Sequence, residues 1–593
     1  MCPANRPIAL SVLASQLAVA LALLLPSTSA AAQLTWFVDA DATGANTGTS
    51  WTDAFVDLRD ALAAATSGDQ LWVAEGVYRP DGGTKDTDLS FILPSGVALY
   101  GGFAGNEVVL NERDVLAHPT VLSGDLDGDD TPEAFLHMSN TDDNSHVIVR
   151  ATGLAEPVTI DGFGIRGGVG GDAAGCVGFE GGGGILAQDS VLLVRQCHAA
   201  LNYAMDGGAA LQLVGCTATL ENCRFDQNKG LFGLFGSTVA AACGSSVRLL
   251  SCRFEKNLST AVHLLSASTG TVEACRFSGN SGENVALDVE DSQVHVRASV
   301  FLGNDGGVAL GTARGTIEDC LFVGNDTPYS GGAIGGFESE LIVDRCTIVA
   351  NSAHGDGGGL FLYGNLSTVV RDSIVWGNDS DQGCCQDAQI FVTGPPGFVE
   401  ISHSCIQGWD GSLGGAGNFK ANPQFVDFTG ADGIEGTGDE DLHLSALSPC
   451  IDAGNPATVA GATDVFGAPR TLDGDLDGSM VVDIGGAEFS CVTLEVERNP
   501  SSVSVDVEST QPLWGFLLVG LSPGATTIPP FGTLLIQPAT LVRIVLGPLP
   551  FHGDFAIPTA ARLPDSVFLQ ALGVKPAAGV GNFSNSVSLD LAP

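Results

Sequence analysis

Short runs of apolar, mostly β-branched residues recur through the middle of the chain. Typical runs are Val294-His295-Val296 and Leu341-Ile342-Val343, and neither has the three- and four-residue spacing of an amphipathic helix. Side chains in such runs alternate between the two faces of a strand. Glycine-rich stretches such as Gly331-Gly332 separate the runs, and glycine there permits positive φ and close packing. The pattern predicts many short strands joined by tight turns.

A cysteine, a phenylalanine and an asparagine return at one fixed spacing. Segments 222–228, 251–257 and 274–280 read NCRFDQN, SCRFEKN and ACRFSGN. The corresponding asparagines are residues 202, 228, 257, 280, 304, 325, 351 and 378, so successive copies lie 21 to 29 residues apart. A period of this length, varying only between motifs, is typical of a solenoid. Three short strands plus turns fill one period, so we predict that each period is one coil of a parallel β-helix.

Stacked coils place equivalent residues above one another at the strand separation of ~4.8 Å. The asparagines are expected in turns, where Asn tolerates a left-handed backbone and its amide can bond to neighbouring coils. Two further ladders are expected in the core. The phenylalanine ladder is Phe225, Phe254, Phe277, Phe301 and Phe322, continued by Ile348 and Val375. The cysteine ladder is Cys197, Cys223, Cys252, Cys275, Cys320 and Cys346, with Ser299 and Ser373 in equivalent positions.

Packing, disulfides or metal could each explain the cysteine ladder. Side chains in register have Cβ atoms near the strand spacing, which is longer than the ~3.8 Å that a disulfide prefers. Zinc is weaker still, because no CxxC pair or Cys/His cluster occurs. We therefore predict free, buried thiols in the ladder. We predict one disulfide elsewhere, between Cys450 and Cys491, which flank an aspartate-rich segment.

The two ends of the chain differ from the repeats. Residues 1–32 carry Arg6, an apolar stretch and the small residues Ala30-Ala31-Ala32, a pattern that predicts a signal peptide and an exported mature chain without a transmembrane segment. After a strand at Trp36 to Val38, the segment SWTDAFVDLRDALAAA from Ser50 predicts a helix that caps the open end of the solenoid, with Ser50 as N-cap. The first coil strand is expected at Leu71 to Ala74.

Cysteine disappears beyond Cys491, and six or seven alternating runs follow within about 100 residues, which predicts a small C-terminal β-sandwich. The predicted fold is all-β: a parallel β-helix solenoid with an N-terminal capping helix, plus this sandwich. The predicted regions are 1–32 (signal peptide), 33–155 (cap and first coils), 156–410 (regular repeats), 411–490 (closing coils with acidic loops) and 491–593 (sandwich).

Composition supports an elongated, exported protein. The chain has 593 residues, among them Gly 79 and Cys 15, and charged residues are only 16%. The formal net charge of −44 leaves no basic surface for a phosphate backbone, so nucleic acid is excluded as an expected partner. Such acidity suits a solvated extracellular protein that collects divalent cations.

The FxxN and GGAI or GGL signatures in phase, as in Phe322 to Asn325 and Gly331 to Ile334, resemble the repeats of polymorphic outer-membrane proteins. More broadly they resemble the right-handed parallel β-helix (pectin-lyase-like) families of exported bacterial proteins. The phrases NPQFVDF from Asn422, SPCIDAG from Ser448 and VDIGGAEF from Val482 resemble the closing coils of choice-of-anchor β-helix proteins. The resemblance implies a right-handed coil from about Trp36 to Glu488 and an appended terminal module for surface attachment, sorting or glycan contact.

Two acidic stretches place carboxylates at alternate positions before a glycine, a spacing that can wrap oxygen ligands around Ca²⁺. The full EF-hand pattern is missing, and a solvated acidic turn explains such stretches equally well. If Ca²⁺ binds, we expect a structural role and no other cofactor. The candidate ligands are Asp125, Asp127 and Asp129 in the first stretch and Asp473, Asp475, Asp477 and Asp483 in the second.

Candidate catalytic chemistry is confined to one file of arginines. Arg224, Arg253 and Arg276 are expected to stack on an outward face beside Asp226 and Glu255, where they could hold an acidic glycan, although an ion-paired strand face explains them as well. We therefore expect a secreted or cell-surface protein, non-catalytic and adhesin-like or glycan-binding, whose partner is an extracellular glycan or cell-surface component. The alternative is a polysaccharide lyase or glycoside hydrolase acting on acidic polysaccharide.

Overall fold

The computed structural model describes residues 33–590 except for gaps, and the predicted signal peptide at 1–32 lies outside the described residues. No helix among the described residues is long and apolar enough to cross a bilayer. The gaps are 134–136, 138, 171, 175–178, 231–235, 283–284, 365, 395–397, 459–460, 462, 475, 477–479, 499–501, 510–513, 521–522, 528–532, 537–541, 557–565 and 576–579.

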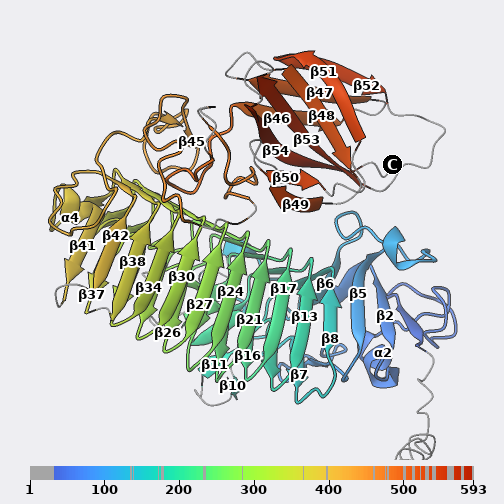
Figure 1. Ribbon diagram of the computed structural model, residues 1–593. Coiled ribbons are helices and arrows are strands. Elements are labelled where there is room, and N and C mark those ends of the chain that lie inside the picture. Colours follow the sequence, from blue (N-terminus) through green and yellow to red (C-terminus); the bar gives the residue numbers. More distant parts are fainter. Residues whose placement is uncertain are drawn as a thin grey trace, which may run out of the picture.

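Three long parallel sheets wind around one elongated core, and each coil contributes one strand to each sheet (Figure 1). Sheet A consists of β1 (Thr35–Val38), β2 (Gln70–Ala74), β5 (Ala98–Phe103), β8 (Val158–Asp161), β13 (Val191–Arg195), β17 (Thr217–Glu221), β21 (Ser246–Leu250), β24 (Thr269–Glu273), β27 (Gln293–Arg297), β30 (Arg314–Glu318), β34 (Glu340–Asp344), β38 (Ser367–Arg371) and β42 (Val399–Ser402). Sheet B consists of β3 (Gly76–Tyr78), β6 (Thr120–Ser123), β9 (Phe163–Arg166), β14 (His198–Ala200), β18 (Arg224–Asp226), β22 (Arg253–Glu255), β25 (Arg276–Ser278), β28 (Val300–Leu302), β31 (Leu321–Val323), β35 (Thr347–Val349), β39 (Ile374–Trp376) and β43 (Cys405–Ile406). Sheet C consists of β4 (Phe91–Ile92), β7 (Val149–Thr152), β12 (Ile185–Gln188), β16 (Gly207–Val214), β20 (Gly236–Ala242), β23 (Thr260–Leu264), β26 (Leu287–Glu290), β29 (Val308–Gly311), β33 (Ile334–Phe337), β37 (Leu360–Tyr363) and β41 (Ile390–Thr393).

Short elements decorate the coils. Next to the B-to-C turns lie β15 (Tyr203–Ala204) with β19 (Lys229–Gly230), and β32 (Asp326–Thr327), β36 (Ser352–Ala353) and β40 (Asp379–Ser380). The remaining short elements of the solenoid are the hairpin β10 (Asp172–Ala174) and β11 (Phe179–Gly181), the 3-10 turn η1 (Leu110–Glu112) and the helix α4 (Gln386–Gln389).

The phenylalanine ladder is confirmed and fixes the register of sheet B. Phe225, Phe254, Phe277, Phe301 and Phe322 lie in successive strands with ring centroids 4.6–4.9 Å apart and nearly parallel rings. The distance between neighbouring rings equals the strand spacing, so the rings stack continuously in the core and exclude water from it.

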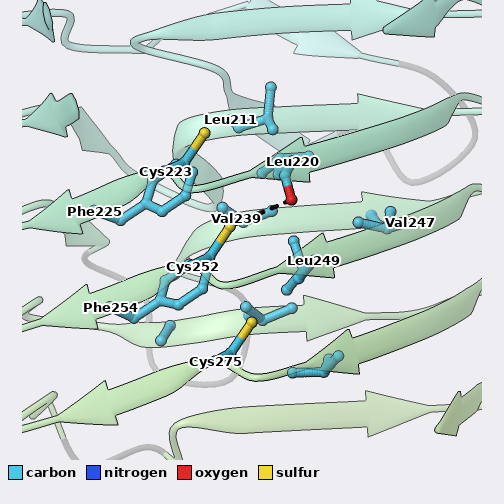
Figure 2. Close-up of a cluster of buried hydrophobic side chains, with 14 of the residues drawn as sticks. Leu211, Leu220, Cys223, Phe225, Val239, Val247, Leu249, Cys252, Phe254 and Cys275 are labelled. Carbon is cyan, nitrogen blue, oxygen red and sulfur yellow. Dashed lines mark hydrogen bonds between the residues drawn. The ribbon is translucent and has the colours of Figure 1, made fainter. Parts of the chain in front are cut away.

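The cysteine ladder consists of free, buried thiols, as predicted. Each thiol lies at the corner between sheets A and B, and several donate to a carbonyl of the preceding coil, such as Cys252 to Leu220 at 3.4 Å (Figure 2). Burial raises the pKa of Cys197 to about 12, so its thiol stays protonated. The ladder therefore serves packing, as a narrow corner requires small apolar side chains.

The asparagine ladder joins coils by side-chain hydrogen bonds. The amide of Asn280 donates to Asn304 Oδ1 at 2.8 Å and to the Phe254 carbonyl at 2.9 Å, and its own Oδ1 accepts from Asn257. The expected left-handed backbone belongs to the residue before each asparagine, for example Lys256, with φ 54°. The asparagine side chain lies inside the turn, where its amide makes these bonds. The preceding residue therefore takes the left-handed position.

The N-terminal cap is shorter than predicted. The helix α2 spans Leu58–Ala64, and its N-cap is Asp57, whose side chain accepts from the Arg59 amide. Ser50 instead accepts from the Asp53 amide in a preceding turn, and Phe55 bridges to Val38 of β1. The apolar residues before Asp57 are therefore used in extended backbone beside β1. Leu58, Ala61 and Leu62 still bury their side chains against the first coils, so the capping role is confirmed.

Residues 411–490 differ from the predicted closing coils. Among the described residues they add no strand to the three sheets beyond an isolated bridge of Phe419 to Cys405, and their hairpin is β44 (Phe425–Asp427) with β45 (Asp441–Leu444). We call residues 419–489 the closing segment. It folds back along the outside of sheet B, where Leu442 and Ile484 pack on Leu321 and Ile374 (Figure 1). The later strands of sheet B carry outward-facing apolar residues. These residues favour a segment that covers them, in place of additional coils.

The C-terminal part forms two antiparallel sheets that share one core, as the predicted sandwich requires. Val492, Val505, Leu517 and Leu569 meet in that core from both sheets. The three-stranded sheet is β46 (Val492–Arg498), β47 (Ser502–Ser509) and β52 (Phe551–Ala556), and the four-stranded sheet is β51 (Val542–Pro548), β48 (Trp514–Gly520), β53 (Ser566–Lys575) and β54 (Val580–Asp590). A separate pair is β49 (Pro523–Thr527) with β50 (Thr533–Ile536).

Candidate functional site: an arginine groove on sheet B

The structure brings the three predicted arginines together. Arg224, Arg253 and Arg276 pair in register on the neighbouring strands β18, β22 and β25. Each precedes a buried phenylalanine of the core ladder, so the alternation of the strand turns all three arginines outward. His198 continues the file on β14, and Val300 ends it on β28.

Among the described residues, one of the three arginines is held by an ion pair. Arg224 contacts Glu255 at 3.1 Å and Asp226 at 3.7 Å, and Asp226 also bonds His198. Within the described part of the chain, Arg253 and Arg276 have no side-chain ion pair or hydrogen bond, although Arg253 is exposed and Arg276 is half-buried. An ion-paired strand face therefore explains Arg224 but leaves two cations without partners.

The file lies in a groove with two walls. Beside Arg224, Arg253 and Arg276 the groove is a hollow of about 600 Å³, which Val465 of the closing segment also lines. At the other end a hollow of about 680 Å³ extends from Arg224 to Arg113 and the loop that follows it. The groove is therefore open along the coil axis over several strand widths, a shape that suits an extended chain.

Arg113 forms the wall at the N-terminal end of the groove. Its guanidinium donates to Asp161 Oδ1 at 2.7 Å and to the Gly101 carbonyl at 3.0 Å, and it lies 5.3 Å from the ring centroid of Tyr100. These bonds tie the loop after η1 to sheet A. Sequence inspection missed Arg113 and His198 as groove residues. The coil period could have identified His198, which lies one period before Arg224, but not Arg113, which lies in an irregular loop.

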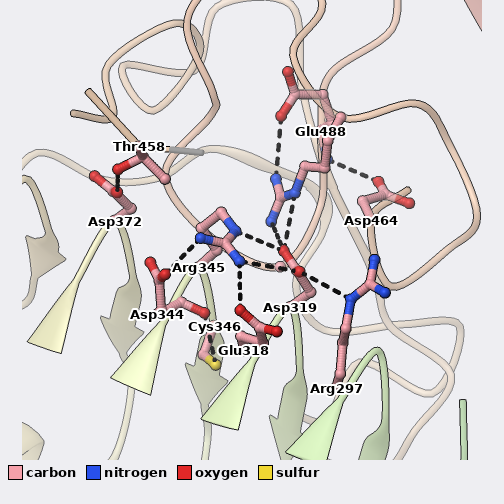
Figure 3. Close-up of polar contacts among 12 residues, drawn as sticks. Arg297, Glu318, Asp319, Asp344, Arg345, Cys346, Asp372, Thr458, Asp464 and Glu488 are labelled. Atoms are coloured by element: carbon pink, nitrogen blue, oxygen red, sulfur yellow. Dashed lines mark hydrogen bonds and ion pairs between the residues drawn. The ribbon is translucent and has the colours of Figure 1, made fainter. Parts of the chain in front are cut away.

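A buried ion cluster anchors the wall at the other end (Figure 3). Arg470 of the closing segment is fully buried and bonds Asp319 at 3.0 Å and Glu488 at 3.1 Å. Arg345 of the next coil bonds the same Asp319 at 2.9 Å. Burial alone would raise the pKa of Asp319, but the charge and hydrogen bonds of Arg470 and Arg345 outweigh it and lower the pKa.

Asp372 and Gly324 provide further attachment points for the closing segment. Asp372 accepts from the Asn455 amide at 2.7 Å and from the Thr458 hydroxyl at 2.6 Å. Gly324 has φ +59° and lies so close to the closing segment that a Cβ there would sit 1.9 Å from the Gly436 carbonyl oxygen. The wall is therefore fixed by specific buried contacts and not by apolar packing alone.

The carboxylates of the groove are already engaged. Asp226 and Glu255 lie in register on adjacent strands, but Asp226 bonds His198 and Glu255 bonds Arg224. Hydrolysis of a glycosidic bond requires one carboxylic acid that donates a proton and one carboxylate that acts as base or nucleophile. Two ion-paired carboxylates do not supply that pair, so the geometry favours binding over hydrolysis.

The first candidate calcium loop is partly assembled. Carboxylate oxygens of Asp125 and Asp129 lie within 4.8 Å of one another and of Asp143, which sequence inspection missed because it follows 14 residues later, beyond the end of the acidic run. Asp127 is not part of this group, because its carboxylate pairs with Lys85 at 2.6 Å. Residues 125–129 lie beyond the end of β6 in irregular backbone, so the even spacing of the three aspartates does not place them on one face.

The second candidate loop is not assembled among the described residues. Asp475 and Asp477 lie outside them, and no described group of three close ligand-type side chains includes Asp473 or Asp483. Asp483 is buried and accepts from the amides of Asp452 at 2.7 Å and Phe489. Burial and the nearby charge of Glu488 raise its pKa. Asp483 therefore orders the end of the closing segment.

The predicted disulfide between Cys450 and Cys491 is not formed. Cys450 is a free, buried thiol, and its neighbour is Cys405, whose proximity together with burial raises the Cys450 pKa. The closing segment folds back on sheet B and carries Cys450 towards β43, while Cys491 enters the core of the C-terminal sheets. Cys243 does carry a disulfide bond.

A family model and two solved structures resemble this chain. The chain matches the family described as "Right handed beta helix region" over residues 161–301 and 237–394. It is similar to the structure titled "Crystal structure of pectate lyase Pel9A", with 12% identity, a TM-score of 0.37 and coverage of 77% of this chain and 97% of that chain. It is also similar to a structure titled "Rhamnogalacturonan lyase", with 11% identity, a TM-score of 0.35 and coverage of 68% and 96%. No curated protein matches the sequence. The three long parallel sheets and the match over residues 161–394 show that the solenoid is a right-handed parallel β-helix.

Proposed function

We propose that the protein is an exported, non-catalytic glycan-binding protein that holds an acidic polysaccharide in the arginine groove. The observation that supports this most is the pair Arg253 and Arg276, two cations that line a groove without a described anionic partner on a chain of net charge −44. An arginine left without a counter-charge on so acidic a surface gains most from an external anion. Guanidinium groups bind carboxylates and sulfates in bidentate geometry.

The spacing of the arginines favours a polymer as ligand. Arginines in register on neighbouring strands repeat at about 4.8 Å, so successive acidic sugars of one extended chain can each meet a different guanidinium. Binding through several weak contacts along one polymer accumulates affinity without a deep pocket. Two adjoining hollows that share Arg224 extend along the file from Val465 to Arg113, which supports an extended ligand.

The test is binding of polygalacturonate to the full mature chain by calorimetry at low and high salt. We expect Arg253→Gln with Arg276→Gln to abolish most binding. The matched control is Arg248→Gln with Arg314→Gln, which removes two exposed arginines of sheet A that pair with Glu273 and Glu340. We expect the control to bind like the wild type, since it loses the same charge elsewhere. Equal losses in both double variants would refute a specific groove.

The alternative, a lyase or hydrolase, is tested on the same samples. Wild-type protein that released unsaturated products or new reducing ends from acidic polysaccharide, with loss of activity in Arg276→Ala, would replace the binding function by catalysis. We expect neither product, because the groove carboxylates are paired and no described metal group lies in it.

We also propose that Asp125, Asp129 and Asp143 bind Ca²⁺ as a structural ion. The support is the convergence of three carboxylates from the two sides of one loop, where an oxygen-ligated cation would offset their mutual repulsion. Loss of Ca²⁺ is expected to loosen this loop, which lies at the N-terminal end of the solenoid, without changing glycan affinity in the groove.

A further inference from the structure

The outer face of sheet C carries a second group of polar side chains, remote from the groove on sheet B. His263 lies on β23 and pairs in register with Asp288 on β26. Glu290 lies two residues after Asp288 and so points to the same side of the sheet. The flanking residues Val262 and Leu287 are in the core. The three polar side chains therefore point to the other face of the sheet, away from the solenoid core.

These three side chains converge but do not bond one another. His263 Nε2 lies 3.8 Å from Asp288 Oδ2 and 4.0 Å from Glu290 Oε2, beyond hydrogen-bonding distance. The His263 side chain is 1% exposed, and its Nε2 has no hydrogen-bond partner. A buried, unsatisfied ring nitrogen aimed between two carboxylates is costly unless a further group satisfies it.

The negative charge of the group is also uncompensated. No lysine or arginine pairs with Asp288 or Glu290 within the described part of the chain, and Asp288 is largely buried. His263 Nε2 lies 3.8 and 4.0 Å from the two carboxylates, so the imidazole makes no hydrogen bond that would offset their charge. Neutral imidazole with a free Nε2 is the form that binds metal ions.

We propose that His263, Asp288 and Glu290 bind one divalent transition-metal ion, with Zn²⁺ as the best match. One imidazole nitrogen and two carboxylate oxygens suit Zn²⁺ or a related first-row ion better than Ca²⁺ or Mg²⁺, which prefer oxygen alone. All three ligand atoms lie within 4.8 Å of one another, and ligands about 2.0–2.2 Å from Zn²⁺ require only a small approach of the two carboxylates.

The ion balances the site in charge and in hydrogen bonding. Two carboxylates and a neutral imidazole carry two negative charges, which one divalent cation neutralises. The cation also supplies the missing partner of His263 Nε2. Glu290 is 42% exposed, so the ion can enter from that side, and three protein ligands leave a fourth position for water or a ligand oxygen.

The test is Zn²⁺ titration of the chelator-treated full mature chain by calorimetry. Two competing sites are removed first: the exposed Cys384 and Cys385 are both changed to Ser in every sample, and excess Ca²⁺ is present to occupy oxygen-only sites. We expect one tight Zn²⁺ per chain and a loss of affinity of about 100-fold or more in His263→Ala.

A second variant guards against misfolding. Asp288→Asn with Glu290→Gln keeps the side-chain shapes, and we expect the same loss of Zn²⁺ affinity with an unchanged circular dichroism spectrum. His295→Ala is the matched control, because His295 is an exposed strand histidine of sheet A that pairs with Glu318. The proposal is overturned if the parent protein binds no Zn²⁺, or if its tight site persists in His263→Ala.

Discussion

The contact between the closing segment and the coils depends on Asp319. Removing the charge of Asp319 is the change whose effect is most readily calculated. Asp319 accepts four hydrogen bonds from two buried guanidiniums, at 2.9 and 3.2 Å from Arg345 and at 3.1 and 3.0 Å from Arg470. Asp319→Asn keeps the side-chain volume but removes the charge. Arg470, 0% exposed, then loses one of its anionic partners and keeps its pair with Glu488.

Breaking a buried ion pair by neutralising one partner costs about 3–5 kcal/mol. The lost pair joins the closing segment to the coils. We therefore expect the free energy of local opening of the closing segment to fall by this amount. At 1.36 kcal/mol per tenfold change, amide protection in this segment should fall by about two to four orders of magnitude. Native-state hydrogen exchange measures this directly.

Asp326→Asn is the matched control, because Asp326 is an exposed aspartate of the short strand β32. We expect its protection pattern to equal that of the wild type. If Asp319→Asn changes protection of the closing segment no more than Asp326→Asn does, the ion cluster does not hold the wall, and the account of the groove boundary is wrong.

The same pair of proteins gives a pH dependence with a fixed sign. The pKa of Asp319 is lowered in the folded protein, so its contribution to stability is fully present above the unfolded-state pKa of about 4 and is lost as pH falls through the folded-state value. The difference in opening free energy between wild type and Asp319→Asn should be constant from pH 7 to about 4 and shrink below it. A difference that grows on acidification would contradict the assignment.

Three further predictions concern the ladders and the calcium loop. Phe277→Ala, which removes a fully buried ring from the stack, should lower the free energy of unfolding by about 3–5 kcal/mol in urea titrations; a loss below about 1 kcal/mol would argue against a close-packed ladder. Asn280→Ala leaves the Asn257 amide and the Phe254 carbonyl without their partner, so we expect a loss of about 3 kcal/mol or more by the same assay, and a neutral result would show that water replaces the ladder. Ca²⁺ should raise the melting temperature of the wild type but not of Asp129→Asn, while Asp142→Asn, an exposed neighbour outside the carboxylate group, keeps the shift; an unchanged shift in Asp129→Asn would exclude this site.

The repeats could be predicted from the sequence because their contacts obey a period. Phe254 contacts Phe225 and Phe277, and Asn280 bonds Asn257 and Asn304, so every important neighbour lies one coil away and appears as a repeated letter. The arginine file follows from the same rule.

Contacts outside the period could not be predicted. Arg470 bonds Asp319 across 151 residues, and nothing in the local sequence around either residue marks the other. The expected closing coils and the disulfide of Cys450 failed for this reason, because both assumed that chain order continues as spatial order. The group of His263 and Asp288 lay within reach of the sequence, since the two are one coil apart, but a single pair without repetition gives no ladder to notice.

The most direct measurement of the central claim is a crystal structure of the protein with a galacturonate oligosaccharide. The account predicts successive carboxylates of one extended chain on Arg253 and Arg276, between Val465 and the loop of Arg113, with the glycosidic bonds intact. A saccharide bound on another face, or one that leaves both guanidiniums in contact with solvent alone, would contradict it.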